Sequence, residues 1–233
     1  WNVKYGYEAL KNHTNNHNAG KHNTAIGVSA MRSNTEGDHN TATGYGALYS
    51  NTTGNYNTAS GHGTLYSNTT GSYNTANGRD ALANNTTGNH NTASGHGTLY
   101  SNTTGSYNTA NGFNALHWCG DERRNCRNNT ATGYGALYRN EGHSNTASGY
   151  AALNENNRGN HNTALGYGTL TKNLNTSRNT AVGAVALNNN TQGEENTAVG
   201  AQALFLNNTG NHNTALGFGA LFWNTIGRGN IAV

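Results

Sequence analysis

The two cysteines of the chain, Cys119 and Cys126, are the residues whose type and spacing point most directly to chemistry. They lie seven positions apart in one segment that also holds His117, Asp121 and Glu122. A structural zinc site normally requires four ligands at suitable positions, whereas a disulfide between the two cysteines requires no further residue. The spacing therefore favours a disulfide over a metal site. A disulfide in turn indicates an oxidising, extracellular setting.

Histidine is abundant but keeps to one place in a repeated phrase. His22, His39 and His90 directly precede an opening Asn, and Tyr56 and Tyr73 hold the same place in other copies. A position shared by His and Tyr indicates a surface column and not a row of metal ligands. No histidine, acid and nucleophile recur together at matched spacing. We therefore expect no enzyme activity, no metal site and no cofactor.

Aromatic residues form further columns, and Tyr45, Tyr134, Tyr150 and Tyr167 all follow the first Gly of a copy. Such stripes contact surface glycans or neighbouring chains, or they stiffen the fold by stacking. All three interpretations stay open.

Sequons for N-glycosylation recur in an Asn-Thr-Thr-Gly stretch that has the composition of a loop. In an Asn/Thr-rich chain some sequons arise by chance, so glycan attachment and an unmodified loop are both open. The candidate acceptors are Asn12, Asn51, Asn68, Asn85, Asn102, Asn128 and Asn207, with further matches at Asn84, Asn175 and Asn189.

All of these residues belong to near-copies of one phrase, Asn-Thr-Ala-x-Gly-x-x-Ala-Leu. Eleven of the thirteen intervals between its opening Asn residues are 16 or 17 residues, and the other two are 21. A fixed short period is typical of a solenoid. The opening residues are Asn2, Asn23, Asn40, Asn57, Asn74, Asn91, Asn108, Asn129, Asn145, Asn162, Asn179, Asn196, Asn213 and Asn230.

The period predicts an all-β fold, a parallel β-solenoid that forms a single domain over residues 1–233. We expect about 13 rungs of 17 residues with two short strands in each: Thr-Ala-x, and Gly-x-Ala/Thr-Leu-x. The two longer intervals place insertions in the loops at 11–21 and 117–128.

Columns that scarcely vary should point into the coil, because side chains alternate along a strand. Burial of each Leu contributes roughly 1.5–3 kcal/mol, so many rungs can stabilise a thin core. The opening Asn residues should stack as an amide ladder. The predicted core ladder contains Ala42, Ala59, Ala76, Ala93, Leu48, Leu65, Leu82 and Leu99.

The position after Ala is polar in the middle of the chain and apolar towards its end. It holds Ser60 and Asn77 in the middle, then Leu165, Val182, Val199 and Leu216 after an intervening stretch. The apolar residues are candidates for an interface with a partner chain. The alternative is a lightly buried edge of the same coil.

Composition excludes several classes of protein. Hydrophobic residues make up 33% of the chain and charged residues 10%, with 32 Gly, no Pro and a net charge of +3. The low net charge and the strict period argue against disorder. A nucleic-acid partner would require a basic stripe, and membrane insertion an apolar run of about 20 residues, and neither is present. The chain begins and ends inside a repeat, so we expect a window on something longer.

The phrases Asn23–Gly27 and Asn179–Gly183 resemble the head repeats of trimeric autotransporter adhesins. The longer phrase Asn40–Gly54 is similar to repeats of phage tail-fibre and bacterial surface-fibre proteins. The resemblance covers essentially the whole chain. It implies a left-handed parallel β-roll, often trimeric, that serves as a surface fibre or adhesive head.

The sequence thus favours a structural or adhesive fibre protein, located outside the cell or on a cell or virion surface. It would assemble with copies of itself as a trimer or a head-to-tail filament, because an open repeat end promotes addition. Surface glycans are a further candidate partner. One alternative is an ice-binding (antifreeze) solenoid, suggested by the column Thr24, Thr41, Thr58 and Thr75. Another is a viral receptor-binding tail fibre.

Overall fold

The computed structural model describes residues 1–13, 20–119 and 126–233. Over these residues the chain is an all-β parallel solenoid of about 13 turns, roughly 17 residues apart, and it contains no helix there. The predicted fold class is confirmed. The chain forms two compact units, Trp1–Asn125 and Cys126–Val233. The prediction of one domain stays a prediction.

Parts of both predicted insertions, residues 14–19 and 120–125, lie outside the described residues. The second of these segments includes Asp121 and Glu122, the two acids considered above as metal ligands.

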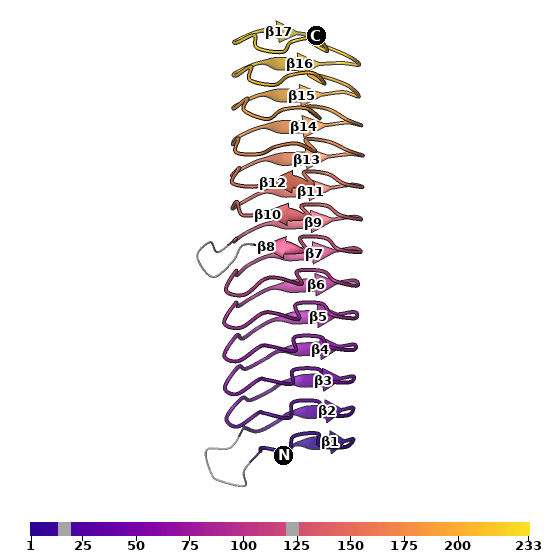
Figure 1. Cartoon of the computed structure of the whole chain (residues 1–233), viewed down its shortest axis with the longest axis vertical. Helices are drawn as coiled ribbons and strands as arrows, with labels where there is room; N and C mark the ends of the chain where they lie inside the picture. The colour runs from indigo at the N-terminus through magenta and orange to yellow at the C-terminus, as the bar shows by residue number, and fades with distance from the viewer. Residues whose placement is uncertain (14–19, 120–125) are drawn as a thin grey trace. The chain divides into compact units, whose positions relative to one another are not determined.

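In the first unit each rung contributes one three-residue strand, and successive three-residue strands pair in parallel (Figure 1). The rung that includes residues 109–119 adds a second strand of two residues. The register does not shift, so Thr41 pairs with Thr58 and Ala42 with Ala59. The elements are β1 (Val3–Tyr5), β2 (Thr24–Ile26), β3 (Thr41–Thr43), β4 (Thr58–Ser60), β5 (Thr75–Asn77), β6 (Thr92–Ser94), β7 (Thr109–Asn111) and β8 (Trp118–Cys119).

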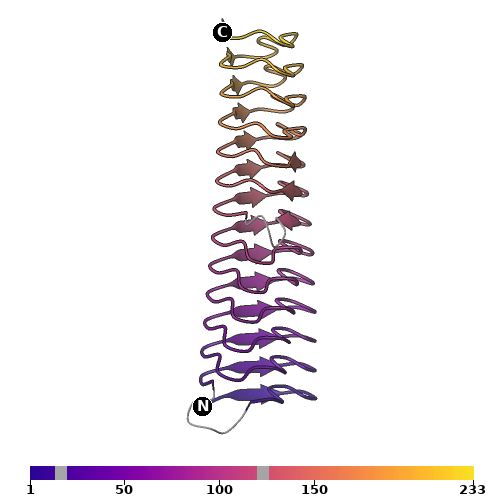
Figure 2. The same ribbon diagram turned by 60° about the vertical axis from the view of Figure 1, so that its left-hand side comes forward.

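The second unit repeats the same arrangement, and Figure 2 shows its strands stacked with the loops of the rungs beside them. Ala164 pairs with Ala181, and Leu165 with Val182. The main strands are β9 (Thr130–Thr132), β11 (Thr146–Ser148), β13 (Thr163–Leu165), β14 (Thr180–Val182), β15 (Thr197–Val199), β16 (Thr214–Leu216) and β17 (Ile231–Ala232). Two shorter strands, β10 (Arg139–Asn140) and β12 (Glu155–Asn156), pair with each other.

The core of each rung is made of small residues and one Leu. The middle Ala of each three-residue strand from β2 to β16 is at most 1% exposed, between two outward side chains. The Leu of the following turn is buried as well, from Leu10 to Leu204, and Met31 holds its place in one rung. Each residue of the predicted core ladder is buried: Ala42, Ala59, Ala76, Ala93, Leu48, Leu65, Leu82 and Leu99.

The second strand predicted in each rung is replaced by a turn. The Gly-x-Ala/Thr-Leu segment contains left-handed residues, with φ of 52° at Leu48 and 51° at Leu65. A left-handed conformation costs a non-glycine residue roughly 1–3 kcal/mol. Burial of the Leu side chain returns a similar amount, and the backbone N–H of Leu65 still donates to the carbonyl of Ala81 at 3.0 Å. Because this turn reverses the chain within a few residues, one rung is completed in roughly 17 residues.

A glycine must follow each three-residue strand because the rungs approach closely there. Gly78 has φ +125°, and a Cβ added to it would lie 2.7 Å from the carbonyl oxygen of Gly95 in the next rung. Both the conformation and the contact exclude a side chain. The first Gly of the repeated phrase is therefore a backbone requirement of stacking.

Two buried rows of asparagine satisfy the polar backbone inside the coil. In the first row, the Oδ1 of Asn40 accepts from the backbone N–H of Asn57 at 2.9 Å, and its Nδ2 donates to the carbonyl of Gly54 at 2.8 Å. Each opening Asn thus joins its own rung to the next. In the first unit this opening row contains Asn23, Asn40, Asn57, Asn74, Asn91 and Asn108.

The second row comes from the Asn-Thr-Thr-Gly loop. The Nδ2 of Asn51 donates to the Oδ1 of Asn34 at 2.8 Å and to the carbonyl of Gly54 at 3.0 Å. Gly54 therefore accepts one amide from each row. Buried polar groups need such partners, since an unpaired group costs about 1–3 kcal/mol. In the first unit the loop row contains Asn34, Asn51, Asn68, Asn85 and Asn102.

Candidate functional site

The outer face of the strands presents two columns in register. In β3 both Thr41 and Thr43 are exposed on either side of the buried Ala42. The Thr column is exposed through the middle of the first unit, at Thr41, Thr58, Thr75, Thr92 and Thr109. Beside it the first unit carries mostly Thr, Ser and Asn.

In the second unit the column beside Thr becomes apolar. Leu165, Val199 and Leu216 are 36%, 38% and 38% exposed, and Val182 between them is half-buried. Successive members are paired in the sheet, so their side chains form one uninterrupted line. The candidate interface residues thus lie together on the surface. We call the four residues the aliphatic strip.

Six rings stack in one column on the first unit. Their centroids are 4.8–5.1 Å apart and their planes differ by at most 12°. The spacing matches the distance of about 4.8 Å between neighbouring strands, so the repeat itself sets the stack. Each ring pair adds roughly 0.5–1.5 kcal/mol beyond its buried area. The rings are those of His22, His39, Tyr56, Tyr73, His90 and Tyr107.

The position after the Leu carries a second aromatic column over five successive rungs of the first unit, and one of these five residues lacks a ring. Tyr49 stacks on Tyr66 at 4.8 Å, and Tyr100 stacks on His117 at 5.1 Å. The rung between Tyr66 and Tyr100 carries Ala83 at this position. We call these five residues the broken column.

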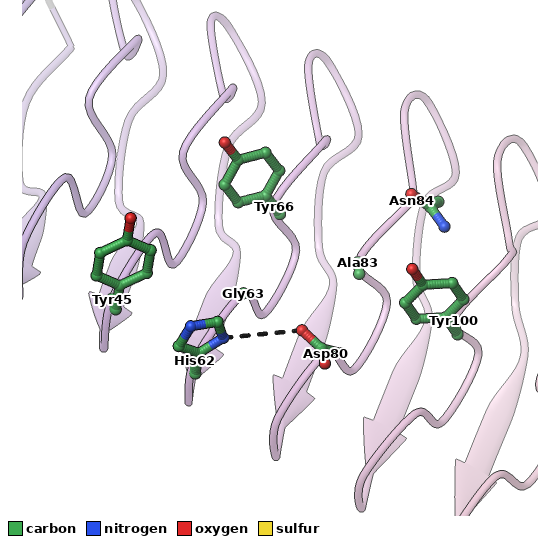
Figure 3. Close-up of a pocket in the computed structure, with 8 residues that line it drawn as sticks. All are labelled: Tyr45, His62, Gly63, Tyr66, Asp80, Ala83, Asn84 and Tyr100. Carbon is green, nitrogen blue, oxygen red and sulfur yellow. Dashed lines mark ion pairs between the residues drawn. The ribbon is translucent and has the colours of Figure 1, made fainter.

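A hollow of roughly 210 Å³ opens at the break (Figure 3). The figure shows the rings of Tyr66 and Tyr100 on the rungs before and after Ala83, with Asp80 and His62 beside it. The hollow is lined by Tyr45, His62, Gly63, Tyr66, Asp80, Ala83, Asn84 and Tyr100.

One carboxylate faces this hollow. A Cβ added to Gly63 would lie 2.5 Å from Oδ1 of Asp80, so the carboxylate covers the backbone of Gly63. Arg79 donates its Nε–H to Oδ2 at 3.2 Å, and Nδ1 of His62 lies 3.9 Å from Oδ1. These are partly exposed surface pairs, which contribute little to stability. Their effect is to leave one acid at the base of an aromatic hollow.

The rung after Tyr100 shows one side chain that can occupy the place left open at Ala83. The imidazole of His117 stacks on Tyr100, and its Nδ1 lies 2.8 Å from the carbonyl oxygen of Gly97. Burial is the main cause that lowers the pKa of His117. The hydrogen bond to Gly97 acts in the opposite direction and raises this pKa, whereas nearby His96 lowers it further. The neutral ring donates from Nδ1.

The hollow was not among the sites predicted from the sequence. A signal for it does exist, because the column Tyr49, Tyr66, Ala83, Tyr100 loses its ring once. The same rung carries Asp80 at the position that Gly63 holds in the preceding rung and Gly97 in the following one. A missing ring leaves a hollow only if the neighbouring side chains do not fill its place. The spacing of residues in the sequence does not reveal how those side chains are oriented.

Both cysteines are disulfide-bonded and buried, at 1% exposure for Cys119 and 0% for Cys126. No cysteine of the described residues is free. In residues 1–13, 20–119 and 126–233, no three His, Cys, Asp or Glu side chains gather closely enough to hold a metal ion. Among the same residues there is no helix with the length and hydropathy needed to cross a membrane.

The structure buries five of the predicted glycosylation acceptors. Asn51, Asn68, Asn85, Asn102 and Asn207 belong to the buried loop row, are 0% exposed, and use their Nδ2 to bind a neighbouring Asn and a Gly carbonyl. A glycan on that nitrogen would break the row. The loop composition was interpreted correctly, but its Asn points inward.

Two predicted acceptors remain on the surface. Asn12 and Asn128 are both exposed, so their glycosylation stays a prediction.

The fold and its stacked surface columns define a β-solenoid repeat protein. Compared with protein-family models, curated proteins and solved structures, the chain has no match.

Proposed function

We propose that this chain is a non-catalytic structural protein of an extracellular fibre that assembles with copies of itself. The aliphatic strip of the second unit is the observation that carries the proposal. Exposed apolar patches on soluble proteins commonly mark contacts with a partner. The neighbouring outward column is Thr163, Thr180, Thr197 and Thr214, so this face of β13–β16 has no charge to keep it in water.

A second copy of the chain is the partner that fits this face best. The strip repeats once per rung, at about 4.8 Å. Side chains of an identical face repeat at the same distance, so they can interdigitate along the whole strip. A partner with another period would match it at only one or two positions.

The finer description of the fibre follows from the sequence resemblance. On that basis the coil is left-handed, of the trimeric-adhesin head or tail-fibre type, and the assembly is a trimer or a head-to-tail filament. Location outside the cell is supported by the two disulfide-bonded cysteines, because such bonds persist in oxidising compartments.

The test is to place a charge in the strip and measure the oligomeric state by sedimentation velocity. Val199→Asp should dissociate the assembly, because a carboxylate would be desolvated between two apolar faces. Thr43→Asp is the matched control, at the same exposed strand position in the first unit. It should leave the oligomer unchanged. A wild-type chain that stays monomeric at every concentration would refute the proposal.

An ice-binding solenoid is the second candidate, favoured by the exposed Thr column of the first unit. Threonines there recur once per rung at about 4.8 Å on a regular sheet. The adjoining column holds Ser60 and Asn77 instead of a second uniform row, which weakens a match to a water lattice. Thermal hysteresis in the wild type, lost in Thr75→Lys, would favour this function over assembly.

A further inference from the structure

The break in the aromatic column leaves space for one ring. Tyr66 and Tyr100 are two rungs apart, which corresponds to about 10 Å at 4.8 Å per rung. A planar ring midway between them would lie about 5 Å from each, within the range preferred by stacked aromatic pairs. Ala83 is the one residue of the broken column without a ring, and it lies at the base of this gap.

The rung that carries His117 shows which ring fits. There an imidazole stacks on Tyr100 with the planes 5° apart and directs Nδ1 to the carbonyl oxygen of Gly97 at 2.8 Å. At the break, the matching stacking partner is Tyr66 and the matching carbonyl is that of Gly63.

In other rungs an asparagine at this position, which has no ring, also donates an N–H to the equivalent Gly carbonyl. The Nδ2 of Asn154 donates to the Gly135 carbonyl at 2.8 Å, and the Nδ2 of Asn188 donates to that of Gly168 at 2.7 Å. Ala83 has no such donor to offer to Gly63. A ligand that reproduces the contact must therefore carry an N–H group at its ring edge.

Asp80 adds a second acceptor beside the first. Its carboxylate lies against the backbone of Gly63, and its side chain is 28% exposed. A ring with two N–H groups can donate one to a carbonyl oxygen and the other to a carboxylate. Protonated imidazole has that arrangement.

We propose that the hollow at Ala83 binds an imidazole-type ring, stacked between Tyr66 and Tyr100 and donating to the Gly63 carbonyl and the Asp80 carboxylate. This site is independent of the assembly face, because it lies on the turns of the first unit.

Imidazole itself is the probe. Ring signals of Tyr66 and Tyr100 should shift in a saturable manner in an NMR titration, whereas the exposed ring of Tyr73 should not. Ala83→His should abolish the shifts by filling the gap with the chain's own imidazole, and His117 shows that the position accepts this residue.

Asp80→Asn should weaken binding about two- to fivefold, the effect of a partly exposed ion pair. Asn114 holds the same left-handed position in another rung, so this variant should fold.

Tyr73→Ala is the control and should leave the dissociation constant unchanged. The experiment distinguishes two sources of the ring, a free small molecule and a histidine of a second copy. In the latter case the Tyr66 and Tyr100 signals depend on protein concentration before any imidazole is added. Linear shifts of all exposed tyrosines alike, or an unchanged titration in Ala83→His, would overturn the proposal.

Discussion

The Nδ2 of Asn68 lies 2.8 Å from Oδ1 of Asn51, and both side chains are fully buried. The same nitrogen donates to the carbonyl of Gly71 at 2.9 Å, and Oδ1 of Asn68 accepts from Asn85 at 2.7 Å. The amides of Asn51, Asn68 and Asn85 thus each link three rungs. The hydrophobic core of each rung is small, and the row of amides adds to the stability of the coil. It does so because it supplies hydrogen-bond partners to buried polar groups that water cannot reach.

Replacement of Asn68 by Ala should therefore destabilise the protein strongly. The change leaves Oδ1 of Asn51 without its donor and Nδ2 of Asn85 without one acceptor, at about 1–3 kcal/mol for each unpaired group. The measurement is the thermal midpoint followed by circular dichroism. Asn84→Ala, at the half-buried neighbouring position, should change the midpoint little. Equal midpoints in the two variants would show that the row does not stabilise the coil.

Glycine should be required after each three-residue strand but not within the following turn. Gly78→Ala introduces a Cβ 2.7 Å from the Gly95 carbonyl and should lower the free energy of unfolding by more than about 1–3 kcal/mol. Gly219→Ala is the comparison, because its φ is also positive but no atom lies within 4 Å of an added Cβ. Ala151 already holds that place in another rung. Chemical denaturation of both variants would rank them, and a reversed ranking would contradict the stacking argument.

Glycan attachment, if the chain passes through a eukaryotic secretory pathway, should be confined to exposed acceptors. Asn12 and Asn128 should carry glycans, whereas Asn68 should be unmodified in folded, secreted protein. Glycopeptide mass spectrometry of the secreted chain reads each site separately. Full occupancy at Asn68 in a protein with an unchanged thermal midpoint would be incompatible with the buried row.

The sequence predicted the solenoid and its core because both depend on period. Ala59 and Leu65 recur at fixed places, and a parallel register follows from that repetition alone. The direction in which Asn68 points was not predictable in the same way. Asn-Thr-Thr-Gly is compatible with an exposed turn or with an inward amide, and only the neighbouring rungs decide between them. The second predicted strand is wrong for a related reason, because a buried Leu65 is compatible with a left-handed turn as well as with extended backbone.

Acidification should destabilise the fold through His117. Burial lowers the pKa of this ring below its ordinary value of 6.5. The unfolded chain then binds more protons than the folded one just below pH 6.5, so stability falls as the pH drops through that region and levels off below the folded pKa. Burial lowers the pKa of His13 and His143 as well, and their contributions have the same sign.

The variant His117→Asn isolates the contribution of this ring. Asn154 shows that an asparagine at this place donates to the preceding Gly carbonyl, so the variant keeps the hydrogen bond and loses the titrating ring. At pH 8, where the rings are neutral, the two proteins should differ chiefly by the stacking on Tyr100, about 0.5–1.5 kcal/mol. Between pH 7 and pH 5 the thermal midpoint of the variant should fall less than that of the wild type. Parallel midpoint curves would mean that His117 takes up its proton as easily in the fold as outside it, and the buried stacking position would then carry no penalty for charge.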